Sequence, residues 1–227
     1  PTTTGFTGDG GTATDARFDQ ISDLEVGGAG NIFVADTNNP RIRMIDPNGN
    51  VSTVAGDGFN SHYGDGGPAA SASLAAPTGI AVDSGQVVVA ENAHLRTFSV
   101  GGDIDTIAGN GTVGVTHSGA LATDAAIAPR DVEIDPTGQI VMTTGPFDCV
   151  RVIAASGRIY TVAGHHDTTT PANPEDVNDG ERAPLAIVAN ARGLATGIEG
   201  TTTSTAGNIY FIDLNTYRLR IAYPGGT

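Results

Sequence analysis

The amino-acid sequence predicts an all-β protein, a β-propeller of four-stranded antiparallel blades. Three observations lead to this prediction. A short apolar segment that follows a glycine occurs four times, an arginine follows each copy at a near-constant interval, and three copies close on a Thr-x-Ala-Gly segment. A repeat of about 50 residues that is built from short strands is typical of a propeller blade.

The repeated apolar segment is predicted to be the second strand of each blade. Its near-continuous apolar character indicates burial on both faces, between neighbouring blades. Its four copies lie at residues 30–36, 85–91, 138–144 and 207–213. Shorter alternating runs predict the first strands at residues 21–26, 79–83, 131–135 and 193–196. The third strands carry the recurring arginines, and the fourth strands end at the glycine of Thr-x-Ala-Gly.

The fourth repeat stops before its last strand. Residues 1–4 precede a Gly-Asp-Gly-Gly segment, as the last strand of a blade does elsewhere in the chain. We therefore expect residues 1–4 to complete the fourth blade and to close a four-bladed ring by a three-plus-one arrangement, which removes exposed strand edges. The expected blades are residues 12–56, 57–109, 110–164, and 165–227 plus 1–4, within a single domain spanning 1–227. The alternative is that the chain forms part of a six-bladed ring.

Composition restricts the partners and the location. The net charge is −14, and all 11 basic residues are arginine. This balance disfavours nucleic acid and anionic membranes, which require clustered positive charge. No apolar run is long enough for a membrane span, and no leader opens the chain, so we expect neither membrane insertion nor a retained signal peptide. The acidic, lysine-free composition, rich in Thr and Gly, favours an extracellular or periplasmic protein.

Several motifs in fixed order closely resemble the NHL-repeat β-propellers. The matching segments are residues 30–39, 41–43, 53–56, 64–69 and 74–83. The resemblance covers nearly the whole chain, and it implies four-stranded antiparallel blades around a central channel. Members of that family are usually six-bladed, whereas this sequence contains four repeats.

Polar side chains are predicted to gather on one face of the propeller. The loops that enter each blade and the hairpins between second and third strands open on the same side. The candidate ligand-binding residues there are Asp36, Asn38, His62, Asp65, Glu91, His94, His117 and Asp213. Such groups can hold calcium through oxygens or zinc through imidazoles, and the resemblance implies this use, since some NHL-like propellers are metal-dependent lyases or hydrolases.

Turn chemistry competes with the metal interpretation. The aspartate of Gly-Asp-Gly-Gly commonly bonds nearby backbone, and its glycines supply positive φ. The histidines do not recur at matched positions, which argues against a set of three histidine ligands. We therefore predict no bound cofactor, with calcium and zinc as the alternatives.

The recurring arginines, which we call the arginine column, are predicted to be structural. They are Arg43, Arg96, Arg151 and Arg220. Each follows the end of a second strand, where Asp36, Glu91 and Asp213 stand as ion-pair partners, and Thr144 breaks the pattern in the third blade. Pairs across the hairpin or with a neighbouring blade are favoured over ligand contacts.

No nucleophile elbow, phosphate-binding loop or metalloprotease motif occurs, and the single Cys149 stands in a strand-like apolar run that predicts an inert, buried thiol. The predicted function is an exported, non-enzymatic interaction or structural module. Its partner would be another protein or a second copy of the chain, and a homo-oligomer would form through the terminal strand or the faces of the disc. The alternatives are a metal-dependent lyase or hydrolase and a small-ligand binder, both using the channel face.

Overall fold

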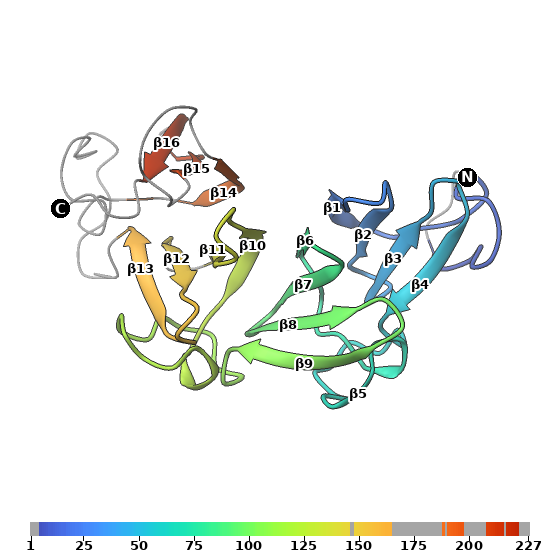
Figure 1. Ribbon diagram of the computed structural model, residues 1–227, viewed down its shortest axis with the longest axis horizontal. Helices are drawn as coiled ribbons and strands as arrows, with labels where there is room; N and C mark the ends of the chain where they lie inside the picture. Colours follow the sequence, from blue (N-terminus) through green and yellow to red (C-terminus); the bar gives the residue numbers. More distant parts are fainter. Residues whose placement is uncertain are drawn as a thin grey trace. The chain divides into compact units, whose positions relative to one another are not determined.

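A computed structural model describes residues 5–145, 148–164, 188, 190–197, 208–215 and 217–222. The chain is an all-β protein built of four antiparallel propeller blades, as predicted. It divides into two compact units, Pro1–Ile107 and Ala108–Thr227, and each unit contributes two blades. Figure 1 follows the strands of both units along the chain. Among the described residues, no helix has the length and apolar character needed to cross a membrane.

Each blade is a meander in which consecutive strands are neighbours. Blade one contains β1 (Ile21–Val26), β2 (Ile32–Asp36), β3 (Arg41–Ile45) and β4 (Val51–Ala55). Blade two contains β6 (Gly79–Asp83), β7 (Gln86–Glu91), β8 (His94–Ser99) and β9 (Asp103–Ala108), with the two-residue β5 (Gly67–Pro68) outside β9.

The second unit repeats this order. Blade three contains β10 (Pro129–Ile134), β11 (Ile140–Thr144), β12 (Val150–Ile153) and β13 (Ile159–Ala163). In blade four the described strands are β14 (Ala191–Gly197), β15 (Asn208–Asp213) and β16 (Arg218–Ala222). The predicted closing strand, residues 1–4, lies outside the described residues, so the three-plus-one ring and its six-bladed alternative stay predictions.

Each unit has a hydrophobic core to which both of its blades contribute. In the first unit, Phe33 and Ile42 of blade one pack in one cluster with Val87 and Ile104 of blade two. In the second, side chains such as Val141 and Phe211 form the corresponding cluster. The predicted burial of the second strands is confirmed for β2, β7 and β11, each of which is buried from its second residue onward. In β15 the burial is interrupted, and Ile212 is exposed.

The Gly-rich loop that enters a blade also covers the outer edge of that blade. The Gly10 N–H donates to Val51 O at 2.8 Å, and the Gly66 N–H donates to Ile104 O at 2.9 Å. The Gly119 N–H donates to Ile159 O at 2.8 Å in blade three. An outer strand that is covered in this way no longer offers its edge to another chain.

One half-buried carboxylate joins the inner strands of the two blades in each unit. Asp23 of β1 accepts the Leu24 N–H through Oδ1 and the Ile80 N–H of blade two through Oδ2, both at 2.8 Å. Asp131 of β10 accepts the Val132 N–H at 3.0 Å and the Leu194 N–H of blade four at 2.7 Å in the same way. One aspartate therefore links the first blade of each unit to the second.

Steric crowding requires glycine at the position that follows a fourth strand. Gly56, after β4, has φ of 94°, and a Cβ there would lie 2.4 Å from Pro40 O. Gly164, after β13, has φ of 88°, with the same distance to Asp148 O. Only glycine fits where the chain turns left-handed so close to the neighbouring hairpin.

Candidate functional site

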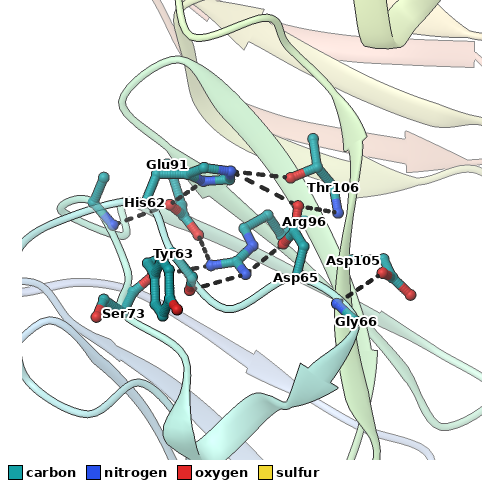
Figure 2. A network of polar contacts seen from close by, with 10 residues as sticks. His62, Tyr63, Asp65, Gly66, Ser73, Glu91, Arg96, Asp105 and Thr106 are labelled. Carbon is teal, nitrogen blue, oxygen red and sulfur yellow. Dashed lines mark hydrogen bonds and ion pairs between the residues drawn. The ribbon is translucent and has the colours of Figure 1, made fainter.

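Four of the predicted candidate residues come together in blade two: His62, Asp65, Glu91 and His94. His62 and Asp65 lie on the loop that enters the blade, and the other two flank the short turn between β7 and β8. Figure 2 shows His62 and Glu91 directed toward each other beside the arginine of β8. We call these four residues, with Arg96 and Thr106, the histidine–carboxylate cluster.

The two imidazoles of the cluster are stacked. Their ring centroids lie 3.7 Å apart, with an interplanar angle of 13°. His62 Nδ1 lies 3.5 Å from Glu91 Oε2, and His62 Nε2 lies 3.8 Å from Asp65 Oδ2. Thr106 Oγ1 lies 3.3 Å from His62 Nε2. The His62 ring is thus surrounded by two carboxylates, a hydroxyl and a second imidazole.

Arg96 neutralises the carboxylates of the cluster from the buried side. Its Nη2 donates to Asp65 Oδ1 at 2.5 Å, and its Nη1 lies 3.5 Å from Glu91 Oε1. The guanidinium also donates to Ser73 O and Tyr63 O. Glu91 is fully buried and accepts the Ala75 N–H at 3.0 Å. Pairing of this kind offsets much of the cost of burying a charge.

The surroundings lower the pKa values of both His94 and Asp65, which favours the neutral form of the histidine and the ionised form of the aspartate. Burial, and next the neighbouring His62 charge, lower the pKa of His94 and favour its neutral form. Burial by itself would raise the pKa of Asp65, but hydrogen bonding by Thr106 and the charge of Arg96 outweigh it, so that pKa is lowered. At neutral pH the cluster therefore combines an ionised Asp65 with a neutral His94.

The stacked geometry does not suit a shared metal ion. A metal lies in the plane of a ligating imidazole, about 2.0–2.1 Å from nitrogen. The nearly parallel planes of His62 and His94 are separated by the stacking distance of 3.7 Å, so one ion cannot lie in both. Within the described part of the chain, no group of three or more His, Cys, Asp or Glu side chains has the arrangement of a metal site.

Thr106, His62 and Glu91 form a line that has the order of a nucleophile, a base and an orienting acid. The line is incomplete, because the buried His62 Nδ1 makes no hydrogen bond. Both oxygens of Glu91 already face other donors, Arg96 and the Ala75 N–H. Sequence reasoning did not select Thr106, although it is the threonine of the Thr-x-Ala-Gly segment and could have been found there.

The candidates of blade one have local structural partners. Asp36 accepts the Asp19 N–H at 2.8 Å and the Asn39 side-chain amide at 2.9 Å, and burial raises its pKa. Asn38 donates to Asp19 Oδ1 at 3.2 Å. These contacts fix the β2–β3 hairpin to the segment that precedes β1.

The two candidates of the second unit have different surroundings. His117 is exposed on the loop that enters blade three. Asp213 is fully buried at the end of β15, and its Oδ2 lies 3.3 Å from Arg220 Nη1.

The arginine column shows both predicted and unpredicted pairings. Arg96 pairs with Glu91 and Arg220 with Asp213 across the hairpin, as predicted. Arg43 forms its ion pair with Asp9 of the Gly-rich loop, at 2.7 Å, rather than with Asp36. The carboxylates of Asp9 and Asp65 thus bind a buried guanidinium and a threonine of the fourth strand, and not the backbone of their own turn as the turn interpretation predicted.

The four meander blades define the chain as a β-propeller protein. No family model matches the sequence. Teneurin-1 of Gallus gallus is 31% identical over an alignment of 157 residues that covers 59% of this chain and 6% of teneurin-1. The chain therefore spans a small fraction of that curated relative.

Solved structures share the fold at low sequence identity. An auxiliary nutrient binding protein from Bacteroides ovatus superposes with a TM-score of 0.65 at 14% identity, covering 95% of this chain and 47% of that one. A catalytically inactive virginiamycin B lyase from Staphylococcus aureus gives a TM-score of 0.52 at 12% identity, covering 95% and 62%. These likenesses show a propeller fold, and membership of the NHL-repeat family stays a prediction.

Proposed function

We propose that this chain is an exported, non-enzymatic interaction module that presents the entry loop of blade two to a protein partner, which can be a second copy of itself. The observation that carries the proposal is the pair of aromatic side chains on that loop. Phe59 is 71% exposed and Tyr63 is 75% exposed, on either side of His62. Exposed aromatic residues are enriched at the centres of protein interfaces.

The loop that carries these aromatics is held in place by several hydrogen bonds. The Asp57 N–H donates to Ala72 O at 2.8 Å, and Asp57 accepts from the Phe59 N–H and from Ser73 Oγ, both at 2.9 Å. A loop fixed in this way loses little conformational entropy when a partner binds, which favours recognition.

The chemistry of the cluster supports binding over catalysis. Its carboxylates are already paired with Arg96, and its imidazoles face each other. Polar groups that are satisfied internally can orient a loop without becoming reactive. The likeness to a nutrient binding protein is consistent with a binding role, and the acidic, lysine-free composition supports export.

The proposal is tested by the mass of the purified protein over a wide concentration range, measured by sedimentation velocity. We expect reversible self-association that weakens when Phe59→Ser and Tyr63→Ser are combined. Tyr217→Ser is the matched control, because Tyr217 is a 91% exposed tyrosine of the other unit. A dilution-stable monomer with an activity that a chelator removes would contradict the proposal.

The alternative is a lyase or hydrolase, and the Thr106–His62–Glu91 line is the observation that favours it. It is tested with a panel of activated esters and lactones, comparing the natural chain with Thr106→Val. Turnover that disappears in this variant while the fold is retained would favour the enzyme. The small-ligand binder stays open as a third use of the same face.

A further inference from the structure

Arg151 is a buried guanidinium for which no acidic partner lies among the described residues. It is fully buried in β12, and its Nη2 donates to Thr116 O at 2.6 Å. Its Nη1 makes no hydrogen bond. The Nε atoms of Arg43, Arg96 and Arg151 are all without an acceptor, so the Nη1 atom distinguishes Arg151 from the other two.

The equivalent arginines of blades one and two each donate to a carboxylate that blade three does not have. In blade one, Arg43 Nη2 donates to Thr7 O and to Asp9 Oδ1. In blade two, Arg96 Nη2 donates to Tyr63 O and to Asp65 Oδ1. Blade three keeps the carbonyl contact through Thr116. Ser118 occupies the place of the aspartate, two residues after the carbonyl, and Thr144 occupies the place of Glu91.

Among the described residues, two acceptors are missing in blade three. One is the carboxylate oxygen that meets Nη2 in the other blades, and the other is the backbone carbonyl that meets Nη1 there, Arg17 O in blade one and Ser73 O in blade two. Asp65 uses one oxygen for Arg96 and the other for the Thr106 N–H. Ser118 has one oxygen, and that atom accepts the matching Thr161 N–H at 2.9 Å. No side-chain oxygen of Ser118 therefore serves Arg151. The hydroxyl of Thr144 is likewise engaged, with the Cys149 backbone.

We propose that Arg151 and Ser118, beside Thr144, form a binding site for a carboxylate group in blade three. The bound carboxylate takes the place that the Asp9 and Asp65 side chains fill in the other blades. It accepts from the guanidinium and from the Ser118 O–H, which is a donor that the Thr161 contact leaves free. A planar carboxylate is the natural partner of such a fork of donors.

Solvent reaches the Ser118 end of the site, on the entry-loop side, whereas the unpaired Nε and Nη1 atoms of Arg151 are covered. Ser118 is exposed, and the side chain of the equivalent Asp65 is 38% exposed even though it touches a fully buried arginine. A carboxylate on a small molecule or on an acidic side chain of another protein can approach along the same route. Binding relieves the cost of burying an unpaired charge, so the ligand stabilises the folded state.

The test is thermal unfolding of the whole chain titrated with sodium acetate, with sodium chloride at equal ionic strength as the reference. We expect acetate to raise the midpoint saturably. Ser118→Asp supplies an internal carboxylate, so this variant should have a higher midpoint without acetate and no further response to it. Ser118→Asn is the matched control, which fills similar space without neutralising Arg151 and should give no such rise.

A reciprocal change in blade two provides an independent measurement. Asp65→Ser removes the carboxylate from Arg96, so this variant should be destabilised and should show an additional response to acetate. If Ser118→Asp fails to fold, Thr144→Glu places the carboxylate from the position of Glu91 instead. Acetyl-Gly-Asp-Gly-Gly-amide, compared with acetate, distinguishes the sources: a response at lower concentration indicates a protein segment, and an equal or weaker response indicates a small carboxylate.

The proposal is overturned if acetate and the peptide have no effect on the natural chain beyond that of chloride. It is also overturned if Ser118→Asp or Thr144→Glu folds and still responds to acetate as the natural chain does.

Discussion

Blade two and blade three use the same strand framework for opposite electrostatic arrangements. At equivalent positions blade two has Asp65, Glu91 and His94, whereas blade three has Ser118, Thr144 and Cys149. The arginine of the third strand is fully buried in both blades. In blade two it is paired with two carboxylates, and in blade three its only described hydrogen bond is to the Thr116 carbonyl.

The comparison separates two roles of the arginine column. The contact to the entry-loop carbonyl recurs in both blades, with Tyr63 and with Thr116, so it belongs to the fold. Of these two blades, only blade two pairs its arginine with carboxylates, so they determine the charge of the site. In blade three the arginine keeps the contact to the entry-loop carbonyl, and we propose that an external carboxylate supplies the ion pair.

The largest expected effect is that of removing the arginine from each blade. Arg96→Met leaves Glu91 buried without its cation, which should lower the free energy of unfolding by about 3–5 kcal/mol. Arg151→Met loses one hydrogen bond but also removes a buried charge that has no acidic partner, so it should cost no more than about 1 kcal/mol. Urea denaturation of both variants measures the difference. Equal losses would show that the carboxylates of blade two do not matter to stability.

A second prediction concerns the inner strands, where blade two has Gly79 and blade three has Asp131. Asp131→Ala leaves the Val132 and Leu194 N–H groups without their acceptor, which should cost about 1–3 kcal/mol. Asp131→Asn keeps one acceptor oxygen and should lose less. Denaturant midpoints test the order, and an Asn variant as unstable as the Ala variant would contradict the bridging role.

The third prediction uses pH. Because burial lowers the pKa of His94 below its ordinary value of 6.5, the unfolded chain binds more protons than the folded chain as the pH falls through that value, and stability should decrease. Asp65, whose folded pKa is also lowered, should add a separate loss below its ordinary value of 3.8. Thermal midpoints measured between about pH 7.5 and about pH 5 isolate the histidine effect.

Two variants assign this pH effect to blade two. His94→Phe keeps a ring against His62 but does not titrate, so the midpoint should vary less with pH. Cys149→Ala changes the equivalent position of blade three. Burial raises the pKa of Cys149 to about 11, so this variant should keep the pH dependence of the natural chain. If His94→Phe leaves the dependence unchanged, the titrating group lies elsewhere.

The smallest expected effect is that of metal removal. The stacked His62 and His94 rings cannot share an ion, and their carboxylate neighbours are paired with Arg96. Treatment with a chelator, or addition of zinc or calcium, should therefore leave the thermal midpoint unchanged. A saturable rise with either metal would show that the cluster rearranges to bind it.

The strands could be predicted from the sequence because they depend on local pattern. The continuous apolar run before Glu91 reflects burial between blades. The glycine at position 56 is required by a close left-handed turn. The gathering of His62 with His94 could also be expected, because the order of the strands brings their two loops to one face. The stacking of the rings could not, since it depends on side-chain rotamers that packing selects.

The partners of the arginine column show where sequence reasoning ends. Spacing along the hairpin indicated Glu91 for Arg96 and Asp213 for Arg220, because those residues are close in sequence to their partners. The pairing of Arg43 with Asp9 joins residues from distant parts of the chain, and it exists only because the entry loop folds back over the outer strand.

The sequence by itself determined the four repeats, the strand order and the type of residue at each blade position. These follow from the alternation of apolar residues and from glycines that local geometry requires. The tertiary structure alone decided which charges are neutralised, because neutralisation depends on distances of a few ångströms between loops that are remote in sequence. The sequence shows Asp65 and Ser118 at equivalent places in the repeat. Only the structure shows that Asp65 reaches the buried arginine of its blade, whereas the oxygen of Ser118 accepts the Thr161 N–H instead.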